Sequence, residues 1–344
     1  MKGVAFLGER KLEIREFEDP TPGTGEVVLQ IRASGMCGTD LGQYRAPIGV
    51  FNSELIGGHE PCGVVVAVGP CVPENLARPG MRVMDHHYKG CGVCNHCRSG
   101  WSQLCRNGME VYGRTAHGSH AEYMKVPAST LVPLPEELSF EVGAAISCGT
   151  GTAWGALQRI GLSGRETIAI FGQGPVGLSA TQFAKAFGAQ VVAIDISEAR
   201  LALAKELGAD IVVNATKDDP VAAIEAVTHG EGAEKTMDCS GNPDARLQAI
   251  RGTRTWGKVA LVGEGGLLTV DVSQYLIRRQ ISLVASWTFS TVGQAECARF
   301  VADRRIPVER IFTNRYRRLE EADGAYRAFD AQSSGKGVFL LGAG

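Results

Sequence analysis

The feature that most constrains the fold is an alternation of short apolar runs with helical segments after about residue 150. The apolar runs cover residues 167–171, 191–194 and 211–213, and the helical segments cover residues 176–187 and 197–207. Buried strands that alternate with helices are typical of a parallel sheet, because each crossover helix covers the sheet that its strands build. The sequence therefore predicts a doubly wound α/β domain.

A glycine-rich turn follows the first of these apolar runs. Gly172, Gly174 and Gly177 form the pattern Gly-x-Gly-x-x-Gly, with Pro175 and Val176 inside it, and a helical segment comes next. In this context the first glycine permits a tight turn, the second lets a pyrophosphate approach the backbone, and the third lets helix and strand pack closely. The N-terminus of the helix supplies a positive end for the phosphates. We therefore expect a dinucleotide-binding domain.

Asp195, at the end of the next apolar run, bears on the choice between NAD and NADP. Its carboxylate would hydrogen-bond the hydroxyls of the adenosine ribose and repel a 2′-phosphate. Ile196 and Ser197 add no positive charge, although Arg200 is close in sequence and is an argument for NADP. The residues favour NAD.

The sequence pattern of the rest of the chain is different. Before residue 135, short β-branched runs are broken by turn residues, which predicts a mostly antiparallel β domain with long loops. A length of 344 residues suggests two domains, at about 150 residues each. We expect one domain from residues 1–149 and 287–344, with the last segment folding back on the first, and a second from residues 150–286.

Four cysteines fall within one short window of the β domain. Cys91, Cys94, Cys97 and Cys105 are separated by two, two and seven residues. A closed set of four thiolates suits a tetrahedral structural zinc. An iron–sulfur cluster is the alternative metal site, but its bacterial pattern has a proline after the last cysteine, where this chain has Arg106. Thiols without a metal are the third interpretation.

A second group of potential ligands is spread along the chain. Cys37, His59, Glu60 and Cys148 supply thiol, imidazole and carboxylate groups, and three or four such ligands with one exchangeable position make a catalytic zinc. Asp40 would then accept a hydrogen bond from the far nitrogen of His59 and set its tautomer. Taken one at a time, the same residues are better explained as a buried cysteine and a loop histidine, and it is their company that favours a metal site.

Composition excludes several classes of function. The formal net charge is −2, so no strong positive field would draw the chain to nucleic acid. The longest apolar runs, such as residues 64–68, are far shorter than the roughly 20 residues of a membrane helix. The N-terminus lacks the apolar region of a secretory signal, so we expect a cytoplasmic protein.

A reducing compartment argues against disulfides among the ten cysteines. Outside the two groups of potential ligands, four cysteines are expected to be plain buried thiols: Cys62, Cys71, Cys239 and Cys297. His117 and His120 are expected to be structural.

Together these motifs resemble a known family. The segment Gly58-His59-Glu60-x-x-Gly63, followed by Gly69 and Val72, is similar to the zinc-site signature of the zinc-containing alcohol dehydrogenases, in the medium-chain dehydrogenase/reductase superfamily. The cysteine window matches the spacing of that family's lobe zinc, and the resemblance covers nearly the whole chain. It implies a GroES-like β catalytic domain, a Rossmann domain, two zinc ions per chain, NAD, and a homodimer or homotetramer.

The resemblance also implies roles for single residues at the catalytic zinc. Cys37, His59 and Cys148 look like its core ligands, with Glu60 as a fourth ligand or a displacing carboxylate. Thr39 resembles the hydroxyl that takes the substrate proton. Phe339 stands where the family often has a basic partner for the glutamate, so Glu60 is expected to be freer to reach the metal.

Further roles concern the cofactor and the substrate. Thr152, Val262 and Gly263 look like contacts on the nicotinamide side, and NAD-preferring members have a basic residue at the spacing of Arg200. His87, which follows His86 in a loop that lines the family's substrate cleft, is a candidate proton relay or polar substrate contact. The alternative is that both are surface-loop histidines. Trp287, Thr288 and Phe289 are substrate contacts or core.

The function that these features favour is a zinc- and NAD-dependent dehydrogenase of a secondary alcohol, such as a polyol or sugar alcohol. A primary alcohol or formaldehyde-type dehydrogenase is the alternative enzyme, supported by Cys148 and by the aromatic Trp287 and Phe289. A non-catalytic NAD-binding redox sensor, which would keep both zinc ions for structure, is the alternative from another class.

Overall fold

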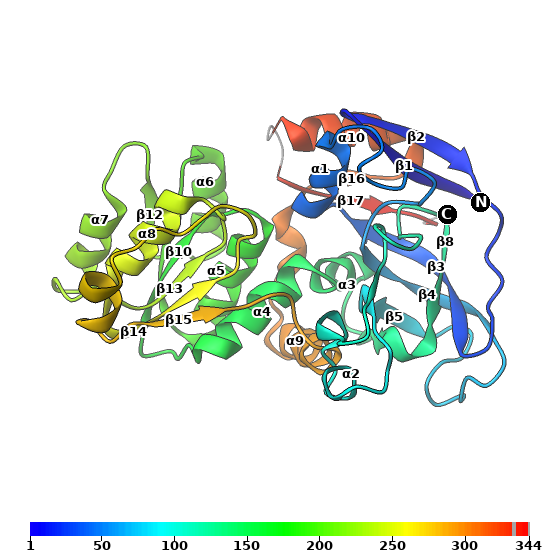
Figure 1. Cartoon of the computed structure of the whole chain (residues 1–344), viewed down its shortest axis with the longest axis horizontal. Coiled ribbons are helices and arrows are strands. Elements are labelled where there is room, and N and C mark those ends of the chain that lie inside the picture. The colour runs from blue at the N-terminus through cyan, green and yellow to red at the C-terminus, as the bar shows by residue number, and fades with distance from the viewer. Residues whose placement is uncertain (332–334, 343–344) are drawn as a thin grey trace. The chain divides into compact units, whose positions relative to one another are not determined.

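The computed structural model describes residues 1–331 and 335–342, and the chain divides into two compact units (Figure 1). Unit 1 contains Met1–Gly151 and Phe289–Gly344, and unit 2 contains Thr152–Thr288. Each unit has its own sheet and its own apolar core. No helix among the described residues is both long enough and apolar enough to cross a membrane.

The main sheet of unit 1 has seven strands within the described residues. Its order is β16-β17-β3-β4-β5-β9, and β8 also pairs with β3. The strands are β3 (Glu26–Gly35), β4 (Glu60–Val68), β5 (Arg82–Asp85), β8 (Tyr123–Pro127), β9 (Leu131–Pro133), β16 (Phe312–Tyr316) and β17 (Lys336–Leu340). All these pairs are antiparallel except β16 with β17. Because β17 pairs with β3, the last segment of the chain completes the sheet that the first segment begins.

Smaller elements surround this sheet. Two short sheets pair β1 (Lys2–Gly8) with β2 (Lys11–Glu16), and β6 (Tyr88–Lys89) with β7 (Glu110–Val111). The α-helices are α1 (Gly38–Arg45), α2 (Asn95–Arg98), α3 (Phe140–Ile146), α4 (Gly149–Ile160), α9 (Thr291–Arg304) and α10 (Ala322–Asp330). The 3-10 helices are η1 (Ser102–Leu104), η2 (Ala128–Thr130), η4 (Val308–Ile311) and η5 (Leu319–Glu321). Of these, α4 begins in unit 1 and continues into unit 2.

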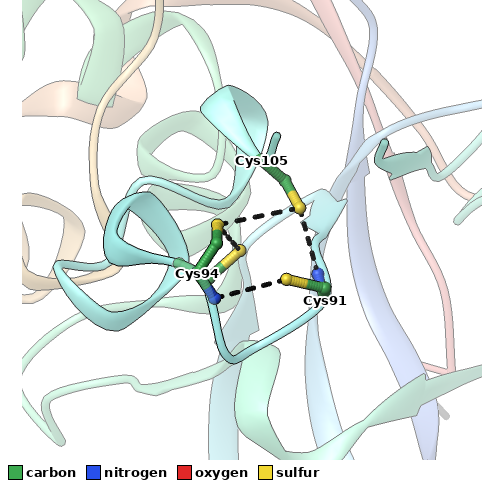
Figure 2. Close-up of side chains that lie close together, drawn as sticks. Cys91, Cys94 and Cys105 are labelled. Atoms are coloured by element: carbon green, nitrogen blue, oxygen red, sulfur yellow. Dashed lines mark hydrogen bonds between the residues drawn. The ribbon is translucent and has the colours of Figure 1, made fainter. Parts of the chain in front are cut away.

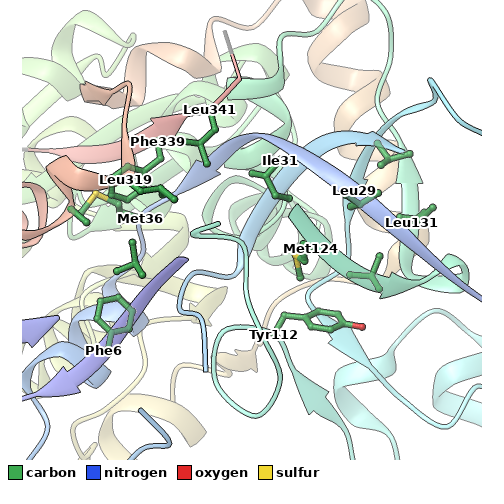
Figure 3. Packing of buried hydrophobic residues seen from close by; sticks show 14 of the residues in the cluster. Phe6, Leu29, Ile31, Met36, Tyr112, Met124, Leu131, Leu319, Phe339 and Leu341 are labelled. Carbon is green, nitrogen blue, oxygen red and sulfur yellow. The ribbon is translucent and has the colours of Figure 1, made fainter. Parts of the chain in front are cut away.

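The core of unit 1 draws on both ends of the chain. Figure 3 shows Leu29 and Ile31 of β3 in the same cluster as Phe339, which comes from β17. Alternate residues of a strand point to one face, so Val27, Leu29 and Ile31 present one apolar face for this packing. The packing brings the segments around Cys37, His59 and Lys336 together.

Unit 2 holds a parallel sheet of six strands among its described residues, in the order β12-β11-β10-β13-β14-β15. The strands are β10 (Thr167–Phe171), β11 (Gln190–Asp195), β12 (Ile211–Asn214), β13 (Ala233–Asp238), β14 (Thr253–Leu261) and β15 (Ser282–Ala285). The helices are α5 (Pro175–Phe187), α6 (Glu198–Glu206), α7 (Pro220–Val227) and α8 (Pro243–Gly252), with the π-turn η3 (Ser273–Ile277).

This strand order is that of a Rossmann fold. The strands remain parallel, but the order in which the chain adds them to the sheet reverses between β10 and β13. Right-handed crossovers then place α5 and α8 on opposite faces of the sheet, which confirms the expected doubly wound α/β architecture. Ligands of such sheets bind at the carboxyl ends of the strands beside the reversal. Gly172 follows β10 at that point, and α5 begins three residues later.

Candidate metal centres and cofactor site

The four residues of the first candidate metal centre converge from three segments of unit 1. Cys37 caps α1, His59 directly precedes β4, which Glu60 begins, and Cys148 lies between α3 and α4. One ligand atom from each lies within 4.8 Å of the others. The Cys148 Sγ is 3.9 Å from the Cys37 Sγ and 3.5 Å from the His59 Nε2. The donor types and their spacing fit a zinc ion.

Asp40 sets the orientation of His59. Its Oδ1 lies 2.9 Å from the His59 Nδ1, so the carboxylate accepts the Nδ1–H and turns Nε2 to the side of the thiols. The Asp40 Oδ2 accepts the backbone N–H of Cys37 at 2.8 Å. One buried carboxylate thus holds two of the candidate ligands.

The charges in this centre act strongly on one another. The hydrogen bond from Cys148 lowers the pKa of Cys37 well below its ordinary value, although burial opposes the shift. Burial lowers the pKa of His59, but the charges of Asp40 and Cys37 raise it well above its ordinary value. The cluster thus favours a thiolate at Cys37 and a proton on His59, and a divalent cation bound there would take the place of that proton.

Glu60 has a basic partner, which the sequence did not lead us to expect. Lys336, the first residue of β17, places its Nζ 2.6 Å from the Glu60 carboxylate and 2.8 Å from the Met36 carbonyl oxygen. Phe339 instead belongs to the apolar core, where its ring centroid lies 5.0 Å from that of His120. The expectation that Glu60 lacks a basic partner is wrong, because the basic residue stands three positions earlier.

The pair of histidines after β5 is buried, so the interpretation as surface-loop imidazoles is wrong. His86 is 0% exposed and His87 is 2% exposed. Burial lowers the pKa of His87 well below its ordinary value, and its Nδ1 lies 2.8 Å from the Ser147 carbonyl oxygen. A neutral ring that donates its Nδ1–H to that carbonyl keeps Nε2 as an acceptor. The His87 ring centroid is 5.1 Å from that of His59.

Aromatic and hydroxyl side chains complete the surroundings of this centre. The Phe289 ring packs edge-on against both histidines, with centroid distances of 5.5 Å to His86 and 6.2 Å to His87. Thr39 is exposed, and its Oγ1 lies 3.8 Å from the Cys37 Sγ. The Trp287 side chain, by contrast, is 39% exposed and belongs to unit 2.

The cysteine window forms the second candidate metal centre. Ligand atoms of Cys91, Cys94, Cys97 and Cys105 all lie within 4.8 Å of one another. Figure 2 shows the three labelled cysteines with their sulfurs turned toward a common centre. The Cys94 N–H points to the Cys91 Sγ and the Cys91 N–H to the Cys105 Sγ, at 3.4 and 3.3 Å. Backbone N–H groups also lower the pKa of Cys94 to about 6, whereas burial raises the pKa of Cys97 to about 12. The convergence of the four sulfurs is what fits a closed zinc site.

The remaining cysteines only partly follow expectation. Cys62 and Cys297 are buried, but Cys239 is half-buried and Cys71 is exposed. The expectation that all four are buried thiols is therefore wrong for Cys71, which lies just after β4 in a turn with a φ of +62°. All ten cysteines lie within the described residues, and all are free thiols.

The glycine turn of unit 2 has the geometry of a phosphate cradle. Gly172 has a φ of +91°, in the left-handed region that favours glycine. A Cβ on Gly177 would lie 1.9 Å from the Gly172 carbonyl oxygen, whereas a Cβ on Gly174 would meet nothing within 4 Å. Open space above Gly174, at the N-terminus of the 13-residue helix α5, leaves room for a pyrophosphate. The site fits the phosphates of a dinucleotide.

Asp195 ends β11 beside this turn. Its Oδ2 accepts the Gln173 N–H at 2.6 Å, and its Oδ1 accepts the N–H groups of Ile196 and Ser197 at 2.8 and 2.9 Å. The Arg200 Nη1 lies 3.9 Å from the same carboxylate. Asp195 therefore fixes the backbone of the glycine turn and places negative charge at the edge of the expected ribose site.

An ion pair between Asp238 and Arg246, which the sequence analysis did not identify, connects the loops that follow β13 and β14 in unit 2. Asp238, at the end of β13, accepts the N–H groups of Ser240 and Gly241 and lies 3.0 Å from the Arg246 Nε. Arg246 also donates to the carbonyl oxygens of Gly263 and Gly266, in the loop after β14. Val262 and Gly263, the expected nicotinamide contacts, thus lie on a loop held by Arg246. Thr152 lies on α4. The sequence signal that could have identified Asp238 is its position at the end of a buried strand, which it shares with Asp195.

We expect the two metal centres to respond differently to loss of one ligand. Cys37→Ser should reduce the zinc content from two ions to one per chain with little change in melting temperature. Cys94→Ser should also remove one zinc but lower the melting temperature by more than about 5 °C, because closed zinc sites contribute folding free energy. Metal analysis and thermal unfolding of both variants provide the test. Equal losses of melting temperature would contradict the division into two kinds of site.

We expect the buried Glu60–Lys336 pair to matter for stability. Lys336→Met leaves a carboxylate without its partner in a fully enclosed position, and should lower the free energy of unfolding by about 3–5 kcal/mol. Adding Glu60→Gln to this variant should recover part of the loss. The control is Lys2→Met, which breaks an exposed pair with Glu320 and should change the free energy of unfolding far less, because solvent screens that pair. Urea unfolding that ranks the two Lys→Met variants equally would contradict the assignment.

Comparison with known proteins agrees with this geometry. Residues 23–136 match the alcohol dehydrogenase GroES-like domain, and residues 175–303 match the zinc-binding dehydrogenase family. An uncharacterized zinc-type alcohol dehydrogenase-like protein of Escherichia coli (strain K12) is 37% identical over 97% of both chains. An L-threonine 3-dehydrogenase of Symbiobacterium thermophilum is 33% identical over 96% of both.

Among solved structures, the alcohol dehydrogenase TADH from Thermus sp. ATN1 has a TM-score of 0.92 at 28% identity, covering 99% of this chain and 100% of that one. Its likeness extends over both units. With two family matches and relatives above 30% identity over nearly the full length, the chain belongs to the zinc-type medium-chain alcohol dehydrogenase superfamily.

Proposed function

We propose that this protein is a zinc- and NAD-dependent dehydrogenase that oxidises a secondary alcohol, such as a polyol or sugar alcohol, to a ketone. The observation that carries the proposal is the convergence of Cys37, His59 and Cys148, with Glu60 engaged by Lys336. Cys37, His59 and Cys148 would hold a zinc ion as three protein ligands, and a site with three protein ligands would also admit a substrate oxygen.

The chemistry divides between the bound groups and the chain. When bound, zinc supplies a positive charge that lowers the pKa of an alcohol, and NAD supplies the hydride acceptor. The chain's own residues orient these groups and move the proton. We assign the first proton transfer to the Thr39 hydroxyl, which lies 3.8 Å from the Cys37 Sγ and would accept the substrate proton as it releases its own to water, because it is exposed.

His87 supports a polar substrate. Its ring is neutral, its Nδ1–H is committed to the Ser147 carbonyl, and its Nε2 can accept a hydrogen bond from a substrate hydroxyl. The threonine dehydrogenase relative, named for a substrate with a secondary alcohol, supports the same class. The Phe289 ring beside His87 is the observation that favours the alternative, a primary alcohol or formaldehyde-type dehydrogenase. The family resemblance also supports a homodimer or homotetramer.

A substrate panel tests the proposal. We expect NADH formation, followed by absorbance, with secondary alcohols among polyols, sugar alcohols and threonine, and slower turnover of primary alcohols and formaldehyde. A chelator should abolish the activity and added zinc should restore it. Faster turnover of primary alcohols would favour the alternative enzyme. Bound NAD without turnover on any alcohol would contradict the enzyme assignment and favour a redox sensor.

We expect NAD to be preferred over NADP because the Asp195 carboxylate repels a 2′-phosphate. Asp195→Asn removes the charge beside Arg200 and keeps one acceptor oxygen, which can be turned to Ile196 and Ser197, while its NH2 group loses the bond with the Gln173 N–H. It should shift the ratio of kcat/KM values toward NADP by about tenfold or more, which corresponds to about 1.4 kcal/mol. Arg200→Ala in the Asp195→Asn background is the matched control and should cancel the gain. A wild-type enzyme that prefers NADP would contradict the assignment.

A further inference from the structure

A chain of buried side chains runs from the candidate zinc ligand His59 into the core of unit 1. Beyond Asp40, the Tyr326 Oη lies 3.2 Å from the Asp40 Oδ2 and 2.6 Å from the His120 Nε2. The Ser34 Oγ lies 2.7 Å from the His120 Nδ1 and 2.7 Å from the Ser119 Oγ. All of these side chains beyond His59 are 0% exposed.

The direction of every hydrogen bond in this chain follows from Asp40. A carboxylate only accepts, so the single Tyr326 hydroxyl proton is directed to the Asp40 Oδ2. The Tyr326 oxygen must then accept the Nε2–H of His120, and the His120 Nδ1 is left as an acceptor for the Ser34 hydroxyl. Burial lowers the pKa of His120 to about 4, in keeping with a neutral ring.

Packing holds this chain in one arrangement. The Tyr326 ring lies 4.9 Å from the Phe6 ring and 5.6 Å from the Tyr44 ring, centroid to centroid. A Cβ on Gly58, which directly precedes His59, would lie 2.4 Å from the His120 Nδ1. The backbone beside the candidate ligand therefore rests against the His120 ring, and the ring has no room to turn there.

The consequence concerns how firmly the two ligands are held. Asp40 joins the His59 ring and the Cys37 backbone, and Tyr326 is its third donor. Without the phenol hydroxyl, the Asp40 Oδ2 would keep only the Cys37 N–H, and the His120 Nε2–H would lose its acceptor in a fully enclosed position. Outer partners of this kind fix the orientation and basicity of metal-ligating histidines.

We propose that Tyr326, on α10, is a positioning residue for the Cys37–His59–Cys148 zinc centre, and that His120 orients its hydroxyl. Tyr326 acts through Asp40. The inference rests on the zinc assignment made in the proposed function. It gives His120 a role beyond the structural one expected from the sequence, and it makes the centre depend on a helix near the C-terminal end of the chain.

The test compares Tyr326→Phe with Tyr44→Phe in the full-length protein. Both remove one hydroxyl from the same aromatic cluster, but Tyr44 lies outside the chain of hydrogen bonds that leads to Asp40. We expect Tyr326→Phe to weaken zinc binding at this centre by about 10–100-fold, as outer-partner substitutions do. The cysteine-window zinc and the Tyr44→Phe variant should be unchanged. Zinc retention against graded chelator concentrations measures the affinities.

Cobalt provides a second measurement that does not depend on turnover. Co²⁺ exchanged into this centre should show a shifted visible absorption band in Tyr326→Phe, because the His59 ring is held less firmly, and an unchanged band in Tyr44→Phe. His120→Phe should weaken zinc binding as well. Because the two residues act in series, the double variant should lose less than the sum of the single losses.

The outcomes separate this inference from the function on which it rests. Zinc affinity within about threefold of wild type and a superimposable cobalt spectrum in Tyr326→Phe would overturn the inference alone. If Tyr326→Phe does not fold, the same measurements on His120→Phe decide in the same way. Wild-type protein that holds no zinc at Cys37, His59 and Cys148 would overturn the proposed function as well.

Discussion

Asp40, Glu60 and Cys37 place negative charge where the side chains of unit 1 are closely packed, and much of that unit serves to compensate it. A buried carboxylate costs several kcal/mol unless donors or cations meet it. Glu60 is met by Lys336 from the last strand, and Asp40 by the Cys37 backbone, the His59 ring and the Tyr326 hydroxyl. The return of the chain's final segment to the first sheet therefore also supplies the cation that Glu60 meets and the hydroxyl that Asp40 accepts.

Unit 2 uses carboxylates in a related way, at the carboxyl ends of two parallel strands. Asp195 and Asp238 each end a buried strand and accept the N–H groups of the turn that follows. Each also has an arginine nearby, Arg200 at 3.9 Å and Arg246 at 3.0 Å. The turns that would hold a dinucleotide are thus shaped by fixed charge before any ligand arrives, which reduces the ordering that binding would require.

Features with short sequence spacing could be predicted. The cysteine window and the glycine turn each lie within fewer than twenty residues, so local backbone geometry brings their side chains together without help from the rest of the fold. The partner of Glu60 lies 276 residues away, and the resemblance pointed to Phe339 instead of Lys336. Tyr326 is 286 residues from Asp40, and it belongs to no motif that would have identified it as a partner. His86 and His87 look like surface residues because burial depends on what packs over a loop.

By itself, the sequence determined the class of each element: a parallel α/β unit with a dinucleotide turn, a β unit with two groups of metal ligands, and membership in a zinc-dependent family. Periodicity, glycine positions and cysteine spacing depend only on residues that are close together in the sequence, so they can be recognised without the fold. Only the tertiary structure decided which charged and polar groups meet inside unit 1. Those pairings join β17 and α10 to β3, β4 and α1, and the free energy that selects them is the cost of leaving any one of these buried groups without its partner.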